Sequence, residues 1–414
     1  MPLRPLQDKR IVLGVSGSIA AYKAADLASK LAQAGAQVDT ILTRAALHFI
    51  TPLTFQSVTG RRAYTDDDLW GSDAHVLHVG LAHNADLLAV APATANTLAK
   101  LAHGLSDDLL GVTALAATCP LLVAPAMDGG MFAHPATQAN LELLQARGAT
   151  VVGPEEGHLA SGLTGRGRMS EPATILDRIR YRLTRGGPLA GRKVVVTAGG
   201  TREPVDPVRY LTNRSSGKQG YAIAQAALDA GAEVTLISTV ESLPLPAGAQ
   251  LYLVETAQEM ADAVLAASAQ ADALVMAAAV ADFRPAQAAG RKIKKESGPP
   301  TLELAANPDI LLAVAQQRRQ TGHPLVVVGF AAETDNLLEN AQAKLERKGL
   351  TFIVANDVSA ADAGFAVDTN RVTLIGVDGW SETLPLMSKA DVAERVIQRV
   401  ARALVEPADV RADL

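Results

Sequence analysis

Residues 193–220 have the sequence KVVVTAGGTREPVDPVRYLTNRSSGKQG. The β-branched run at its start is typical of a buried strand, and the two glycines after it are typical of a turn. A helix is expected from about Lys218, and its first backbone N–H groups, preceded by Ser-Ser-Gly, predict an anion site. Loops of this length between a strand and a helix are uncommon and are often functional, although a loop that only covers the sheet edge remains an alternative.

The same order of strand, glycine turn and helix begins near the N-terminus, where residues 11–23 read IVLGVSGSIAAYK. Short apolar runs then alternate with Ala-rich helical stretches in both halves of the chain, which indicates parallel sheets with crossover helices. We therefore predict an α/β protein with two Rossmann-like domains and mainly parallel sheets. The breaker-rich stretch at 185–188 predicts the domain boundary, with domains at 1–188 and 189–414.

Composition narrows the classes of function. The 414 residues are 48% hydrophobic and 20% charged, a globular balance, and the net charge of −5 offers no field that would attract a nucleic acid. Cys119 is the only cysteine, which fits a reducing cytoplasm. No apolar run approaches the roughly 20 residues of a membrane-spanning helix. The expected partners are small molecules, with no nucleic acid and no membrane.

The turn after residue 13 favours a mononucleotide phosphate over a dinucleotide. The Gly-x-Gly-x-x-Gly pattern fails because Ser16 and Ile19 occupy two of its glycine positions. Backbone N–H groups and serine hydroxyls at a helix start can still bind a phosphate. A plain tight turn between strand and helix is the alternative on this feature alone.

Three further segments, HVGL (78–81), APATANTLAK (91–100) and APAM (124–127), follow in this order. Together with the turn they resemble the flavin-dependent cysteine decarboxylases, the family of phosphopantothenoylcysteine decarboxylase, over residues 10 to about 175. The resemblance implies a flavodoxin-like domain that binds FMN, with His78 as the active-site histidine. It also implies a set of cofactor-binding residues: Gly17, Ser18, Thr43, Thr94 and Asn96.

This resemblance implies a redox-neutral decarboxylation with two departures from the family pattern. FMN would oxidise the cysteinyl carbon to a thioaldehyde, which accepts the electrons as CO2 leaves, and would then return the hydride. Asp128 stands where the family usually has asparagine, so it would have to be protonated or reoriented to serve a substrate carboxylate. Ser161 stands where relatives carry the cysteine of the reductive step, and a hydroxyl is a much weaker acid than a thiol. We expect both residues to belong to the catalytic site.

The segment 198–220 strongly resembles the phosphopantothenate–cysteine ligase domain. The resemblance continues through AAAVADF (277–283), KIKK (292–295), NPDI (307–310), GFAAET (329–334) and ANDV (355–358), and covers residues 190 to about 400. It implies that Asn213 holds the carboxylate or the acyl intermediate. It also implies CTP-binding residues: Ala278, Asp282, Lys292, Pro308, Asp309, Ile310, Leu311, Phe330, Lys344 and Lys348.

The implied ligase reaction has two steps. The carboxylate of phosphopantothenate attacks the α-phosphorus of CTP and releases pyrophosphate, and the amine of cysteine then displaces CMP from the acyl cytidylate. Mg²⁺ would neutralise the triphosphate, and the sequence assigns no protein ligands to it.

Three hypotheses follow from the sequence. The leading one is a bifunctional enzyme of coenzyme A biosynthesis whose C-terminal half makes phosphopantothenoylcysteine and whose N-terminal half decarboxylates it. The second keeps the ligase and makes the flavin domain an assembly module, because of Asp128 and Ser161. The third is a nicotinamide oxidoreductase, which the failed dinucleotide pattern disfavours. By resemblance, we expect a homo-oligomer in which the flavoprotein domains form trimers and the ligase domains form dimers.

Overall fold

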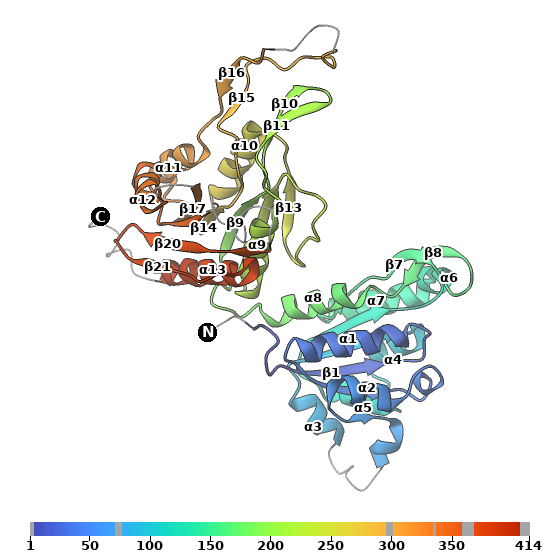
Figure 1. Ribbon diagram of the computed structural model, residues 1–414. Helices are drawn as coiled ribbons and strands as arrows, with labels where there is room; N and C mark the ends of the chain where they lie inside the picture. The colour runs from blue at the N-terminus through green and yellow to red at the C-terminus, as the bar shows by residue number, and fades with distance from the viewer. Residues whose placement is uncertain (1–3, 71–76, 295–300, 334–336, 358–367, 406–414) are drawn as a thin grey trace. The chain divides into compact units, whose positions relative to one another are not determined.

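The chain divides into two compact units, Arg4–Leu183 and Thr184–Leu414, each with its own core. The computed structural model describes residues 4–70, 77–294, 301–333, 337–357 and 368–405 (Figure 1). The predicted boundary at residue 188 lies in the turns that join the last helix of the first unit to the first strand of the second. Among the described helices, none combines the length and apolarity that crossing a membrane requires.

The first unit contains one large parallel sheet and one hairpin. Its elements are β1 (Arg10–Val15), α1 (Ala21–Gln33), β2 (Gln37–Leu42), η1 (Ala46–His48), α2 (Pro52–Thr59), β3 (Ala63–Tyr64), η2 (Asp66–Trp70), α3 (Leu77–His83), β4 (Leu87–Ala93), α4 (Ala95–His103), α5 (Leu109–Ala116), β5 (Leu121–Pro125), α6 (Gly129–Ala133), α7 (Pro135–Ala146), β6 (Thr150–Val151), β7 (Glu155–His158), β8 (Thr164–Arg168) and α8 (Pro172–Leu183).

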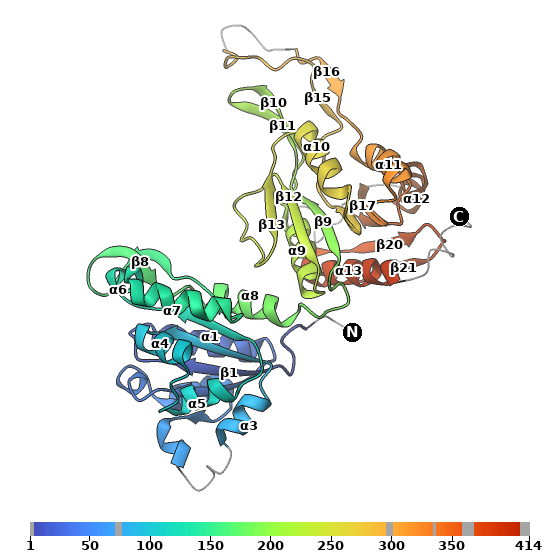
Figure 2. The same cartoon turned by 180° about the vertical axis from the view of Figure 1, so that it is seen from behind.

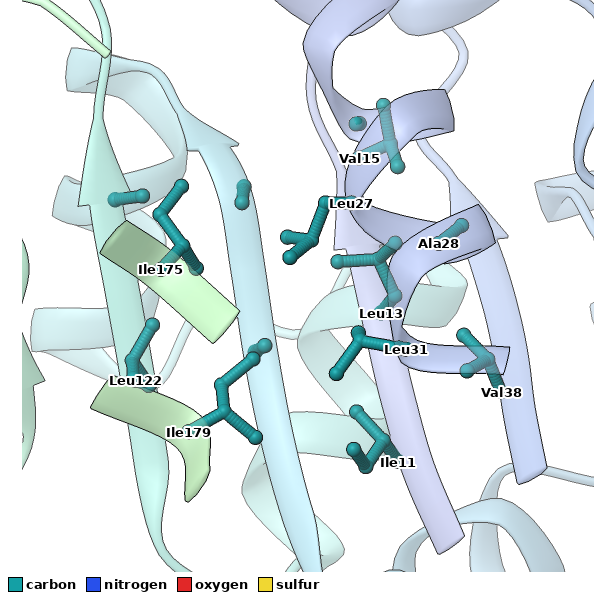
Figure 3. Packing of buried hydrophobic residues seen from close by; sticks show 14 of the residues in the cluster. Ile11, Leu13, Val15, Leu27, Ala28, Leu31, Val38, Leu122, Ile175 and Ile179 are labelled. Carbon is teal, nitrogen blue, oxygen red and sulfur yellow. The ribbon is translucent and has the colours of Figure 1, made fainter. Parts of the chain in front are cut away.

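The strand order of this sheet is β3-β2-β1-β4-β5-β6, and every pair is parallel. Without the two-residue edge strand β3, it is the flavodoxin-like order 2-1-3-4-5. The alternation of side chains along β1 separates two apolar layers. Ile11, Leu13 and Val15 pack in one cluster with Leu27 of α1, and Ile175 of α8 joins this cluster on the side of Leu122, as Figure 3 shows. Val12 belongs to the cluster on the opposite face, so the helices sandwich the sheet.

The second unit is built around an eight-stranded mixed sheet. Its elements are β9 (Lys193–Ala198), β10 (Arg202–Asp206), β11 (Arg209–Thr212), α9 (Lys218–Asp229), β12 (Glu233–Ser238), β13 (Gln250–Leu253), α10 (Ala257–Ser268), β14 (Ala273–Met276), β15 (Phe283–Pro285), β16 (Leu304–Ala306), α11 (Ile310–Thr321), β17 (Val326–Glu333), α12 (Leu337–Lys348), β18 (Phe352–Asp357), β19 (Thr369–Asn370), β20 (Val372–Gly376), β21 (Ser381–Thr383), β22 (Met387–Ser388) and α13 (Lys389–Val405).

The strand order here is β13-β12-β9-β14-β17-β18-β20-β21, parallel from β13 to β18 and antiparallel at β20 and β21. The predicted class, two Rossmann-like layers with mainly parallel sheets, is confirmed. In both sheets the order in which strands are added reverses beside the first strand, between β1 and β4 and between β9 and β14. Ligands in open α/β sheets bind in the crevice at the carboxyl ends of the strands beside such a switch point, which directs attention to the loops after these four strands.

Candidate active sites

The second unit has a cavity of about 730 Å³ at the carboxyl edge of its sheet. The loop after β9 supplies Asn213 and Gly217, the loop after β14 supplies Ala278 and Asp282, and β17 supplies Phe330. All predicted nucleotide-binding residues except Lys292 line this one cavity, together with Asn213: Ala278, Asp282, Pro308, Asp309, Ile310, Leu311, Phe330, Lys344 and Lys348. Residues up to 135 positions apart in the predicted set, 213 and 348, therefore line one cavity at the carboxyl edge of the sheet.

The helix α9 begins at this cavity without a side-chain cap. Gly217 precedes it with φ of +78°, a left-handed conformation that glycine adopts without strain. Gly217, Gln219 and Gly220 all line the cavity, so the first turn of α9 meets the cavity with its orphan N–H groups. This arrangement and the positive end of the helix dipole suit a phosphate group.

Lysines from α12 give the opposite wall a positive charge. Lys344 donates a hydrogen bond from Nζ to the carbonyl oxygen of Phe330 at 2.8 Å. Lys348 is buried and forms an ion pair with Asp309, the N-cap residue of α11. Burial lowers the pKa of Lys348 from its ordinary value, while the nearby charge of Asp282 acts in the opposite direction.

Asn213 faces the loop after β14. Its side-chain amide donates to the carbonyl oxygens of Ala279 and Val280 at 3.2 and 3.3 Å. These contacts occupy the amide nitrogen and tie Asn213, which lines the cavity, to the loop after β14. An amide N–H exchanged from one of these two carbonyls can donate to the oxygen of a carboxylate or of an acyl group.

Sequence reasoning missed a polar group that lines the same cavity. Asn370 donates to Gln219 at 2.8 Å, Gln219 donates to the carbonyl oxygen of Lys389 at 3.1 Å, and Asn356 contacts Asn370 at 3.5 Å. Burial lowers the pKa of Lys389, and the charge of Lys218 adds to the effect. Asn356 belongs to the ANDV motif and could have been singled out, whereas Lys389 carries no signal beyond its place at a helix start.

Lys292 does not line the cavity. It lies on the segment between β15 and β16 and is exposed to solvent. Its neighbour Lys295, also quoted from the motif, lies outside the described residues.

In the first unit, the predicted cofactor-binding residues follow the ends of three neighbouring strands. Gly17 and Ser18 follow β1, Thr43 follows β2, and Thr94 follows β4 as the N-cap of α4, with Asn96 in its first turn. Gly17 passes so close to the next loop that an added Cβ would lie 2.5 Å from the Cβ of Ala45. The sheet thus gathers all five at one edge.

Ser16, which the sequence did not single out as a binding residue, joins two of these loops. Its buried hydroxyl donates to the carbonyl oxygen of Pro92 at 2.7 Å and accepts from the backbone N–H of Thr94 at 3.0 Å. The Thr43 hydroxyl oxygen beside them is buried and has no hydrogen-bond partner among the described residues. A buried polar atom of this kind, at the edge where ligands bind, suits a polar cofactor group.

Asp128 and Ser161 lie together although 33 positions separate them. The Ser161 hydroxyl, at the tip of the β7–β8 hairpin, donates to Oδ2 of Asp128 at 2.8 Å, and Oδ1 accepts from the N–H of Gly130 at 2.9 Å. These bonds, that from Ser161 first, lower the pKa of Asp128. Of the two adjustments considered for Asp128, protonation is thus disfavoured. Asp128 lines a cavity of about 610 Å³ that Phe132 and Arg166 also line.

His78 lies on α3. Among the described residues it forms no hydrogen bond with Asp128, with Ser161 or with the five cofactor-binding residues. Its Nδ1 is buried and has no partner within the described part of the chain. Within the described part of the chain, hydrogen bonds therefore connect His78 neither to the residues at the sheet edge nor to those at the hairpin.

Comparison with known proteins finds a matching family for each half of the chain. The family model described as DNA/pantothenate metabolism flavoprotein C-terminal domain matches residues 189–404, and the model described as Flavoprotein matches residues 2–184. The chain is 45% identical over 399 residues to the coenzyme A biosynthesis bifunctional protein CoaBC of Bacillus subtilis, covering 96% of this chain and 97% of that protein.

A second relative and a solved structure are also similar to this chain. The CoaBC protein of Mycobacterium tuberculosis is 46% identical over 408 residues, which cover 96% of this chain and 97% of that protein. A crystal structure of the C-terminal domain of a CoaBC protein is 37% identical, with a TM-score of 0.45, and covers 53% of this chain and 98% of its own. The chain belongs to the family of CoaBC proteins, the coenzyme A biosynthesis bifunctional proteins.

Proposed function

We propose that the chain converts phosphopantothenate to 4′-phosphopantetheine in two consecutive reactions. Residues 189–414 form a CTP-dependent phosphopantothenate–cysteine ligase, and residues 1–188 form an FMN-dependent phosphopantothenoylcysteine decarboxylase. The observation that carries the proposal is the cavity at the carboxyl edge of the second sheet, which is lined by residues from both motif-bearing loops and by the lysines of α12. The names of the full-length relatives support it.

Two anionic groups have complementary places in this cavity. The start of α9 at Gly217 is the place for the phosphate of phosphopantothenate, because its N–H groups lack other partners within the helix. Lys344 and Lys348, four positions apart on one face of α12, are the place for the triphosphate of CTP. Phe330 and the turn from Pro308 then border the rest of the nucleotide.

The ligase reaction follows from this placement. A carboxylate oxygen of phosphopantothenate forms a bond to the α-phosphorus of CTP, and the bond to the β-phosphate oxygen breaks, so that pyrophosphate leaves. The lysines stabilise the negative charge that grows on pyrophosphate. The neutral amine of cysteine then bonds to the acyl carbon, CMP leaves with the electron pair of the acyl C–O bond, and the amine loses a proton. Asn213 holds the acyl group in both steps.

Mg²⁺ enters this site with the nucleotide. Among the described residues, no cluster of three or more His, Cys, Asp or Glu side chains could form a protein cage for a metal ion. Mg²⁺ commonly binds through one or two carboxylates, several waters and the phosphates of the substrate. Asp282 and Asp309 are carboxylates on the cavity wall and are the candidates for that role.

For the decarboxylase, the loops after β1, β2 and β4 hold FMN. Gly17 and Ser18 bind its phosphate through backbone N–H groups, and Thr43, Thr94 and Asn96 offer polar groups at the same edge. Bound FMN supplies the electron sink that the loss of CO2 requires. Asp128 and Ser161, joined by their hydrogen bond, orient the hairpin tip toward the substrate, and His78 assists proton removal at the thiol.

We also propose that the protein is a cytoplasmic homo-oligomer, with trimers of the first unit and dimers of the second. Large apolar side chains on the first unit are exposed and would be covered in such an assembly: Ile19, Tyr22, Phe49, Leu53 and Met131.

Thr43→Val is expected to weaken FMN binding about fivefold, because one hydrogen bond of roughly 1 kcal/mol is lost without a change in shape. Thr40→Val is the matched control, since its hydroxyl is also buried without a partner among the described residues but lies within β2. Titration of the apoprotein with FMN by fluorescence measures both affinities. Equal affinities in the two variants would contradict the assignment of Thr43.

The ligase is tested most simply by leaving out cysteine. With phosphopantothenate, CTP and Mg²⁺, the protein should release pyrophosphate in an amount close to that of its sites and retain CMP as the acyl cytidylate, and adding cysteine should release CMP. Steady pyrophosphate release without phosphopantothenate, or none with it, would contradict the proposal.

A further inference from the structure

A group of polar side chains in the ligase cavity has no part in the reaction described so far. It comes from separate elements of the chain: Asn356 near the end of β18, Asn370 in β19 and Lys389 at the start of α13. Figures 1 and 2 both show α9 and α13 side by side. Gln219, in the first turn of α9, donates to the carbonyl oxygen of Lys389 at 3.1 Å, so the two helix starts meet at the cavity.

Asn356 carries an acceptor that the described part of the protein does not use. The residue is 8% exposed, and its Oδ1 is buried without a hydrogen-bond partner among the described residues. Its Nδ2 contacts Oδ1 of Asn370 at 3.5 Å, and Nδ2 of Asn370 donates to Gln219 at 2.8 Å. A buried amide oxygen without a partner costs free energy, and a donor from a ligand would remove that cost.

Lys389 is a buried cation in an unfavourable position. It is 6% exposed and is the first residue of α13, where the positive end of the helix dipole disfavours a positive charge. Burial lowers the pKa of its amine, the charge of Lys218 adds to this effect, and the charge of Asp368 opposes it. A bound anion beside Lys389 would offset these costs.

A cation and an unused acceptor beside the same helix start are complementary to an α-amino acid. The carboxylate of an amino acid pairs with a lysine, and its amino group donates to an amide oxygen. A phosphate group offers acceptor oxygens, which the amide oxygen of Asn356 would repel. In the proposed reaction, phosphopantothenate and CTP already have places at the start of α9 and at the lysines of α12, whereas cysteine has none.

We propose that Lys389 and Asn356 form the cysteine subsite of the ligase, in which Lys389 binds the α-carboxylate and Oδ1 of Asn356 accepts from the α-amino group. This inference rests on the proposed ligase function. Asn370 is a positioning residue, because its side chain contacts the amide of Asn356 and is itself bound to Gln219. An amine held through one N–H keeps its lone pair for the acyl group, which Asn213 holds in the same cavity.

The test compares cysteine with cysteamine, which has the same amine and thiol but no carboxylate. Each is added to the full chain with phosphopantothenate, CTP and Mg²⁺, and the release of CMP gives kcat/KM. Lys389→Met is expected to lower kcat/KM for cysteine roughly 10- to 100-fold, mainly through KM, because a charge-assisted hydrogen bond in a buried site is lost. The value for cysteamine should change by less than about twofold, since cysteamine has no group for Lys389 to bind.

Asn356→Leu separates the amine contact from the carboxylate contact. Leucine has nearly the volume of asparagine but no acceptor, and both nucleophiles carry the amine. This variant should therefore lower kcat/KM for cysteine and for cysteamine to a similar extent, about 3- to 10-fold. Lys389→Arg, which keeps the positive charge, should retain most of the preference for cysteine over cysteamine.

Arg395→Met is the matched control for the loss of charge. Arg395 also lies on α13, but it pairs with Glu382 and is not among the described residues that line the cavity. Both kcat/KM values should stay unchanged. In every variant, pyrophosphate release before cysteine is added should match the wild type, which shows that the variant is folded and still binds phosphopantothenate and CTP.

Three results would overturn the subsite. An equal loss with cysteine and with cysteamine in Lys389→Met would remove the carboxylate contact, and a raised KM for CTP or phosphopantothenate would assign Lys389 to that substrate instead. Wild-type kinetics in Asn356→Leu would remove the amine contact. Failure of the wild-type protein to release pyrophosphate with phosphopantothenate and CTP would instead overturn the proposed function itself.

Discussion

Replacing Asn213 by aspartate should lower the rate of amide formation by about 100- to 1,000-fold, the range found when one donor to a developing negative charge is removed. The side chain at this position donates to the loop after β14 and faces the cavity. A carboxylate there can no longer donate, and it repels the carboxylate of phosphopantothenate and the phosphate of the acyl cytidylate. The effect should fall on kcat more than on KM for CTP, because the nucleotide is held by other groups.

Rapid-quench measurements of pyrophosphate and CMP release separate the two steps of this prediction. Asn140→Asp is the control, because it makes the same change of charge at a residue that bonds to His103 in the first unit. A variant at position 213 that forms the amide at the wild-type rate would remove Asn213 from the mechanism.

Lys348→Met should raise KM for CTP roughly 10- to 100-fold, since a hydrogen bond between charged groups contributes about 1.5–3 kcal/mol. Lys348 is buried on the cavity wall beside Asp309, so its charge acts in a partly desolvated site. Lys193→Met is the control, because that exposed lysine begins β9 at the opposite edge of the sheet. An unchanged KM for CTP in Lys348→Met would exclude this lysine from nucleotide binding.

The pH dependence of kcat/KM for CTP should reflect the lowered pKa of Lys348. Burial lowers the pKa of this amine, so in the free enzyme it loses its charge at a lower pH than an ordinary lysine. The wild-type value should therefore fall as the pH rises through the lowered pKa. In Lys348→Arg the guanidinium stays charged, and the alkaline fall should disappear or move to higher pH.

The sequence predicted the parallel sheets because each buried strand is a continuous run of apolar residues. Such runs at 11–15 and 194–197 correspond to β1 and β9, and the glycine turns after them correspond to the switch points of the two sheets. The family was recognised from joint motifs, and the comparisons confirm it. The same topology explains why the nucleotide-binding residues that line the cavity lie together. Each of them comes after the carboxyl end of a strand or faces that end of the sheet.

Contacts between distant loops could not be predicted. The hydrogen bond between Asp128 and Ser161 depends on how the β7–β8 hairpin folds back, and no periodicity encodes that. Asn370 and Gln219 meet across 151 positions for the same reason. The β10–β11 hairpin had a signal in Asp206-Pro207, a common turn pair, but nothing in the sequence predicts the hydrogen bond between Asp206 and Ile293, 87 positions apart.

The central claim is tested by incubating the purified protein with phosphopantothenate, CTP, Mg²⁺ and cysteine labelled with ¹³C in its carboxyl group, and by following products with mass spectrometry. The account predicts CMP, pyrophosphate, ¹³CO2 and unlabelled 4′-phosphopantetheine in equal amounts. Labelled phosphopantothenoylcysteine that accumulates without ¹³CO2 would contradict the decarboxylase assignment, and the absence of CMP would contradict the ligase assignment.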